Sequence, residues 1–317
     1  MPTDNATSTS DDNPEAKQTR VPTAGTVRLL VQEGPRLAPV VSQGSFGEKN
    51  CGAPDALLRS TASKKPRWIS ASGCGLCALT SYLAAADLKG PRYDRSSKTF
   101  SIDASAKPVT PGTFNRYLWN KVDSETTADV SKESLVNDVY AMDGKGALNY
   151  KSATLTRWIE ELVEINGLSI DEPFRIADET MCPNPKIGSD IPILTEHLEA
   201  GEPAIVGVSF IETPSSTAHQ VLAIGYARVG AKTFYLILDS GFGALTPAPL
   251  LNVPNPAPIA RIKPYAVSEQ PRSAMHGTVT YAGITWVRQL SGLASLTKFR
   301  LLEDWTLANP FFPPPKE

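Results

Sequence analysis

Cysteine, histidine, long apolar runs and an excess of one charge are all scarce in this 317-residue sequence. Its four cysteines are too few for a disulfide-stapled scaffold of this length. Basic and acidic residues nearly balance, at 31 and 33, which gives no support to nucleic-acid binding. No run of about 18 or more apolar residues occurs, so no membrane span is expected. The first residues lack the basic start and apolar segment of a classical secretory signal.

The remaining composition predicts a protein with a packed core. Hydrophobic residues make up 41% of the chain and charged residues 20%, and the length allows one large domain or two modest ones. We expect a soluble chain made in the cytoplasm, for which export would need a route without a cleaved signal. Residues 1–24 are polar and aperiodic, which predicts a disordered tail.

The hydrophobic periodicity predicts helices early in the chain and strands late. The helices are expected at 75–89, 111–121, 153–165 and 191–200. Strands are expected at 25–32, 203–210, 218–227 and 233–239, with a strand pair at 276–289; residues 33–73 and 170–190 read as irregular. This order indicates an α+β fold with a largely antiparallel sheet.

Two of the cysteines, Cys74 and Cys77, lie in the stretch "SGCGLCALTSYLAAA", where a Gly-rich turn opens a helix. A zinc site would need two more ligands at suitable spacing, but Cys51 and Cys182 stand alone. A dithiol redox pair would need a surrounding βαβ pattern, which is missing. Two readings remain from the residues. Both thiols are buried core groups, or one is a nucleophile activated at a helix N-terminus.

A nucleophilic cysteine needs a histidine to share its proton and a third group to orient that histidine. His219 begins the predicted strand "HQVLAIGYA", and Asp239 follows the next one, "FYLIL". Neighbouring antiparallel strands bring such positions together, although His219 could equally be an ordinary strand histidine. His197 lies off the apolar stripe of its helix and His276 in a polar turn, so both are expected at the surface.

Taken in order, these motifs resemble papain-like cysteine peptidases of the C39-like kind. The resemblance covers about residues 40–245. Its pieces are "VVSQGS", "SGCGLCALTSYLAAA", "PVTPGTFNRYLWNK", "LEAGEPAIVGV", "AHQVLAIGY" and "YLILDSGFG". Leu76-Cys77 stands where the family usually has Pro-Thr, and Ser240 where it has Pro.

The resemblance implies a papain-like fold with a central N-terminal helix packed on an antiparallel sheet. It assigns Cys74 as nucleophile, with Cys77 as the alternative, together with His219 and Asp239. Gln43 becomes the candidate oxyanion-hole donor. The long gap between Cys74 and His219 implies an inserted helical or irregular subdomain at about 87–190, within a peptidase domain spanning 25–250. Residues 251–317 form a C-terminal extension, expected to pack on the same domain.

The expected function is therefore a cysteine peptidase or amidase that uses no cofactor and no metal. Its substrate would be a peptide, a protein or a peptidoglycan stem peptide, and a bacterial effector toxin is one such setting. The rival from another class is a non-catalytic binding module that keeps the papain-like frame. The sequence does not identify an export or immunity partner.

Overall fold

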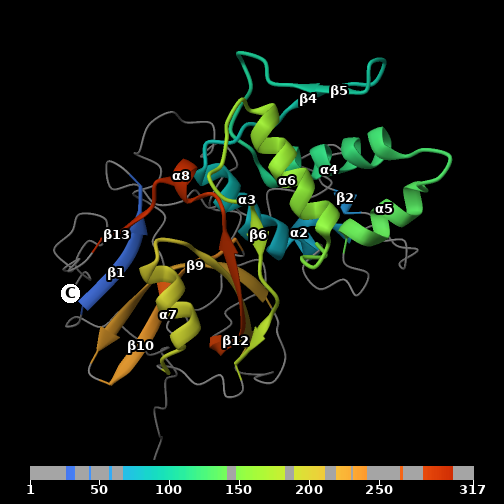
Figure 1. The fold of residues 1–317 in the computed structure, drawn as a ribbon. Coiled ribbons are helices and arrows are strands. Elements are labelled where there is room, and N and C mark those ends of the chain that lie inside the picture. Colours follow the sequence, from blue (N-terminus) through green and yellow to red (C-terminus); the bar gives the residue numbers. More distant parts are fainter. Residues whose placement is uncertain are drawn as a thin grey trace, which may run out of the picture.

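The computed structural model describes residues 26–32, 43, 57–58, 67–140, 148–182, 189–210, 219–229, 231–240, 265–266 and 281–302, and every structural statement below concerns these residues. The predicted tail at 1–24, Cys51 and His276 lie outside them. The described part is an α+β structure in which helices cover a mainly antiparallel sheet (Figure 1).

The sheet is built around an antiparallel meander. Its strands are β8 (Ala204–Phe210), β9 (His219–Val229) and β10 (Lys232–Leu238), as the sequence predicted apart from shifts of one or two residues at their ends. The order along the sheet is β11-β10-β9-β8-β12-β6. The short outer strands are β11 (Tyr265–Ala266), β6 (Arg175–Ile176) and β7 (Thr180–Met181), the last of which also pairs with β12.

Residues near both ends of the described chain also join this sheet. Strand β1 (Thr26–Val31) pairs with the second half of β9 and with β13 (Arg300–Leu302). The predicted strand pair at 276–289 was wrong: a single strand, β12 (Tyr281–Ser291), pairs along β8. Residues 283–288 of β12 are all buried, and the strand pairs with β8 on one side and with β6 and β7 on the other. Part of the proposed C-terminal extension is thus an interior strand.

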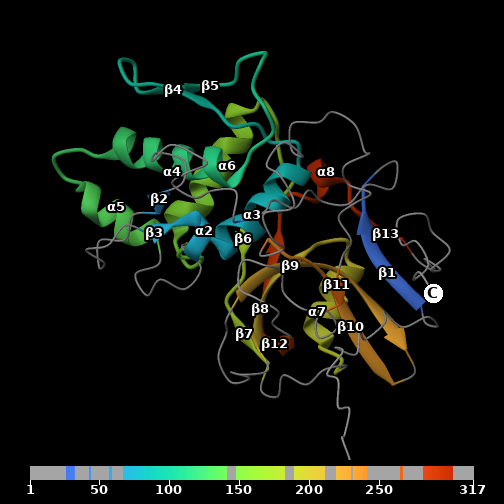
Figure 2. The ribbon, with the colours of Figure 1, turned by 180° about the vertical axis from the view of Figure 1, so that it is seen from behind.

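The helix that carries both cysteines, α3 (Cys74–Ala85), lies between the sheet and the helices of residues 111–165 in both views (Figures 1 and 2). Every residue from Gly75 to Ala85 is buried, because α3 packs on β9 on one side and on α4 on the other. The helix ends four residues earlier than predicted. Asp87 adopts a left-handed backbone conformation, with φ of 56°, and Leu88 donates its N–H to the carbonyl of Leu83.

The segment at 87–190 supplies the helices on the far side of α3. They are α4 (Pro111–Glu125), α5 (Lys132–Val139) and α6 (Ala153–Ile165), preceded by the hairpin β4 (Arg92–Asp94) and β5 (Thr99–Ser101). The predicted stripe of α6 is buried, and Thr110 and Thr113 form a capping box before Pro111 at the start of α4. Contrary to prediction, residues 170–190 are not wholly irregular, because β6 and β7 extend the sheet beside β12.

Helices α4 and α6 share one hydrophobic core with α3 and the sheet. A charge cluster adds to their contact: Lys121 and Arg157 each pair with both Glu125 and Glu161. Burial of Glu125 opposes its ionisation, but the hydrogen bonds from Arg157 and Lys121 outweigh it and lower the pKa of this carboxyl to about 2. The helical segment is thus tied to α3 rather than set apart.

The remaining helices are short. Helix α2 (Ile69–Ser72) follows the two-residue strands β2 (Leu57–Leu58) and β3 (Arg67–Trp68), and α8 (Ala294–Thr297) follows β12. Helix α7 (Pro192–Glu199) packs on the sheet strands β8, β9 and β12. Within the described residues, no helix is both long enough and apolar enough to cross a membrane.

Candidate active site

The first turn of α3 places Cys74 and Cys77 in different surroundings. Cys74 is the first helical residue and is partly exposed, whereas Cys77 is fully buried. The preceding residue, Gly73, has no room for a side chain: a Cβ there would lie 2.6 Å from the Ile69 side chain and 2.8 Å from its carbonyl oxygen. Glycine therefore lets α2 fold back tightly and start α3 at Cys74, where the helix dipole favours a thiolate.

The predicted partnership of His219 and Asp239 is present as a buried hydrogen bond. The distance from His219 Nε2 to Asp239 Oδ1 is 2.7 Å, and the two residues are only 3% and 7% exposed. An ionised carboxylate only accepts hydrogen bonds, so Nε2 carries the proton in this contact. Proton exchange with a thiol therefore falls to the other ring nitrogen, Nδ1.

Both residues reach this contact through the pairing of β9 and β10. His219 is the first residue of β9, and Asp239 follows the last residue of β10, where Leu238 pairs with Leu222. The antiparallel register brings the start of one strand to the end of the other, as the sequence suggested.

Neighbouring residues connect this pair to the first turn of α3. The side chain of Ser240, next to Asp239, lies close enough to the thiol of Cys77 to lower the pKa of that thiol, although the Ser240 hydroxyl makes no hydrogen bond within the described residues. The hydroxyl of Tyr150 donates to Gln220 Oε1, next to His219, at 3.3 Å. Burial raises the pKa of that Tyr150 hydroxyl, and a negative charge on nearby Cys74 raises it further. The cysteine pair and the histidine–aspartate pair thus belong to one neighbourhood.

Gln43 also lies against this neighbourhood. Its backbone N–H donates to the carbonyl of Ser240 at 2.8 Å, and its side-chain Nε2 donates to the carbonyl of Ser70 in α2 at 3.2 Å. The residue is 2% exposed, and its Oε1 has no hydrogen-bond partner. A primary amide has two N–H donors, and one of them is used on Ser70. Gln43 is therefore anchored between Ser240 and the turn that precedes Cys74.

Sequence reasoning missed Tyr150, Gln220 and Arg288. Arg288, in β12, is 7% exposed, pairs with Glu179 at 2.9 Å and lies over the Tyr150 ring at 5.2 Å from its centroid. Its Nε has no hydrogen-bond partner. The only signal for it in the sequence was a lone charge inside the apolar run "ITWVRQL". Tyr150 had none, because it lies in a loop far along the chain from Cys74.

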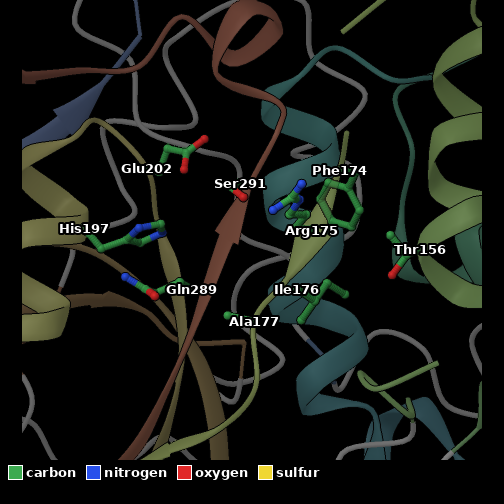
Figure 3. A pocket seen from close by; sticks show the side chains of 9 residues that line it. All are labelled: Thr156, Phe174, Arg175, Ile176, Ala177, His197, Glu202, Gln289 and Ser291. Carbon is green, nitrogen blue, oxygen red and sulfur yellow. The ribbon is translucent and has the colours of Figure 1, made fainter. Parts of the chain in front are cut away.

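The prediction that His197 is solvated was wrong. Its Nε2 lies 3.0 Å from the carbonyl oxygens of both Pro203 and Leu290, and burial lowers the pKa of the ring. Helix α7 packs on β12 with this side chain inward, where the ring joins two backbone segments. His197 also lines a pocket of about 520 Å³ between α7, β12, β6 and α6 (Figure 3). None of the predicted catalytic residues lines this pocket.

The two thiols of α3 should differ strongly in reactivity. Burial raises the pKa of the Cys77 thiol, and a charge on Cys74 raises it further, despite the opposing effect of nearby Ser240. We expect iodoacetamide at pH 7 to label Cys74 and to leave Cys77 unmodified until the protein is unfolded in guanidinium chloride. Peptide mass spectrometry of residues 68–89 measures this directly. Labelling of Cys77 first in the native protein would show that the assignment of the two thiols is reversed.

Within the described residues, no group of three His, Cys, Asp or Glu side chains is arranged to hold a metal ion. Comparison of the chain with protein-family models, with curated proteins and with solved structures gave no match.

Proposed function

We propose that the protein is a cysteine peptidase or amidase with a papain-like arrangement, in which Cys74, His219 and Asp239 form the catalytic triad. The observation that carries the proposal is the buried 2.7 Å contact between His219 Nε2 and Asp239 Oδ1. Asp239 precedes Ser240, which lies beside the Cys77 thiol, and β9, which His219 begins, packs on α3. By contrast, the other described histidine, His197, contacts two backbone carbonyl oxygens and no carboxylate.

The chemistry of the proposed triad follows from these positions. Cys74, as thiolate, attacks the carbonyl carbon of an amide bond. His219 holds the thiol proton on Nδ1 and delivers it to the leaving amine, while Asp239 stabilises the imidazolium through Nε2. Water then hydrolyses the thioester, with His219 acting as base. Cys77 is the less suitable nucleophile, because its buried thiol resists ionisation.

The negative charge that develops on the substrate oxygen during attack needs hydrogen-bond donors to stabilise it. The backbone N–H groups in the first turn of an α-helix point toward its N-terminus, and the Gly73 N-cap of α3 makes no side-chain hydrogen bond there. We assign the second N–H of Gln43 Nε2 as the side-chain donor, which its anchoring to Ser70 places beside the turn before Cys74. The helical segment at 87–190 is then the inserted part that faces the sheet across α3.

The test of this function is trapping of an acyl-enzyme. Incubation with a mixed peptide library or with p-nitrophenyl acetate should give an acyl mass on the peptide of residues 68–89, removed by hydroxylamine. Turnover should yield new peptide termini in the library. A protein that folds normally, alkylates Cys74 no faster than free cysteine and never acylates would be the binding module instead.

The charge of Asp239 should matter in addition to its hydrogen bond. Asp239→Asn keeps an oxygen that accepts from Nε2 but removes the negative charge, so the imidazolium loses its stabilising partner. We expect kcat/KM to fall about tenfold to a hundredfold, and Asp239→Ala to cost about 10²–10⁴-fold. The basic limb of the pH–activity profile should move to lower pH in Asp239→Asn. An unchanged profile would show that Asp239 has a structural role only.

Peptidoglycan stem peptides and ordinary proteins remain distinct outcomes of the same assay. Digestion of purified peptidoglycan, followed by mass spectrometry of the released muropeptides, identifies the first. New termini in a denatured protein substrate identify the second.

A further inference from the structure

The proposed triad leaves one part of "CGLC" unused, namely the buried thiol of Cys77. We propose that Cys77 is the resolving thiol for Cys74: when peroxide oxidises Cys74, Cys77 closes a disulfide within the first turn of α3. The site would then be switched off reversibly instead of being destroyed. This inference rests on the proposed function only in taking Cys74 as the reactive thiol.

The positions of the two cysteines suit this bond. They stand three residues apart in α3, so their side chains share one face of the helix, with Cβ atoms about 5–6 Å apart. A disulfide needs Cβ atoms about 3.5–4.5 Å apart, so closing it requires a movement of only about 1–2 Å. That movement falls in the first helical turn, which has few internal hydrogen bonds and contains Gly75 between the cysteines.

Exposure determines which thiol reacts first. Cys74 is partly exposed at the helix N-terminus, where thiolate is favoured, and Cys77 is fully buried. Peroxide therefore meets Cys74 before Cys77. None of the three described cysteines, which include Cys182, forms a disulfide in this structure, so both thiols of α3 are in the reduced state from which the reaction starts.

Oxidation of Cys74 itself prepares Cys77 to react. A negative charge on Cys74 is the second cause, after burial, that raises the pKa of the Cys77 thiol. The sulfenic acid is neutral, so this repulsion disappears once Cys74 is oxidised. The nearby Ser240 hydroxyl acts in the opposite direction, and because it has no other hydrogen-bond partner within the described residues it is available to donate to the Cys77 thiolate.

The chemistry balances in two steps. The Cys74 thiolate attacks one oxygen of hydrogen peroxide, and the O–O bond breaks to give the sulfenic acid and hydroxide. The Cys77 thiolate then attacks the Cys74 sulfur, an S–S bond forms, and the sulfenic oxygen leaves as hydroxide and is protonated to water. A dithiol reductant returns both thiols by exchange.

The experiment uses the full-length protein and needs no substrate. After treatment with hydrogen peroxide, free thiols are blocked with iodoacetamide and the protein is digested with trypsin without reduction. Cleavage after Arg67 and Lys89 gives one peptide that contains both cysteines. We expect this peptide to lose two hydrogen atoms in mass and to carry no alkyl group, and dithiothreitol to restore both alkylation sites.

Variants separate the inference from general oxidation. Without the resolving thiol, in Cys77→Ala and in the near-isosteric Cys77→Ser, Cys74 should gain two or three oxygens. The thiol recovered with dithiothreitol should then fall at least about tenfold. Cys182→Ala is the matched control, because it removes another described thiol and should behave as wild type. Circular dichroism checks that each variant folds.

Two results would overturn the inference: a wild-type Cys74 that over-oxidises as fast as in Cys77→Ser, or a disulfide from Cys74 to Cys51 or Cys182. The proposed function fails separately, through the acylation assay. A Cys74–Cys77 disulfide in a protein that never acylates would leave the resolving role intact and reject only the peptidase.

Discussion

Replacing Cys74 by alanine should abolish hydrolysis, lowering kcat by at least about 10⁴-fold while the protein stays folded. The reason is that the other thiol of α3 is a poor substitute: Cys77 is fully buried, and burial raises the pKa of its thiol. The measurement is the rate at which new peptide termini appear, together with loss of the acyl mass on residues 68–89.

The control for this prediction is Cys77→Ala. Because the Cys77 side chain fills space in the core on which α3 packs, the substitution should lower the free energy of unfolding by about 1–3 kcal/mol. It should leave most of the activity at about 25 °C. The opposite pattern, with activity lost in Cys77→Ala and kept in Cys74→Ala, would move the nucleophile to Cys77. Activity kept in both variants would reject cysteine catalysis.

Replacing Gly225 by alanine should produce the largest loss of stability among conservative changes in the sheet. A Cβ at this position would lie 2.3 Å from the carbonyl oxygen of Arg28 and 2.9 Å from Leu29 Cα, both in the backbone of β1. Since neither atom can rotate away, β1 must separate from β9. We expect a loss of about 3 kcal/mol, at the upper end of overpacking costs. In thermal denaturation this corresponds to a Tm lower by about 5–10 °C.

Gly167→Ala is the contrasting variant, because a Cβ there meets nothing within 4 Å and the only strain is the left-handed φ of 69°. We expect it to cost about 1–2 kcal/mol, less than Gly225→Ala. Equal losses in the two variants would show that close approach of β1 is not the reason for glycine at 225.

The elements that could be predicted from the sequence are those with strong local periodicity. The stripe of α6, the Thr-Pro start of α4 and the meander β8-β9-β10 came out close to their predicted bounds. Elements held by distant partners were missed. Strands β6 and β7 are two residues each and exist only because β12 lies beside them.

The features of the candidate site also fall into those that follow from local sequence and those that depend on distant residues. The sequence by itself determined that Cys74 opens an apolar helix and that His219 and Asp239 stand at adjoining ends of neighbouring strands. Strand alternation and turn residues are local properties, so these positions follow from spacing. From the sequence, Cys74 was the preferred nucleophile and Cys77, about a turn into the helix, the alternative.

Only the tertiary structure decided how the two thiols differ. The packing of α3 on β9 buries Cys77 against Ser240 and leaves Cys74 partly exposed, which sets their ionisation apart. The tertiary structure also brings together Tyr150, Gln220 and Arg288 around the site. It places the His197 side chain in the core. Burial and charge at a point in space depend on residues far apart in the chain, and no local pattern encodes them.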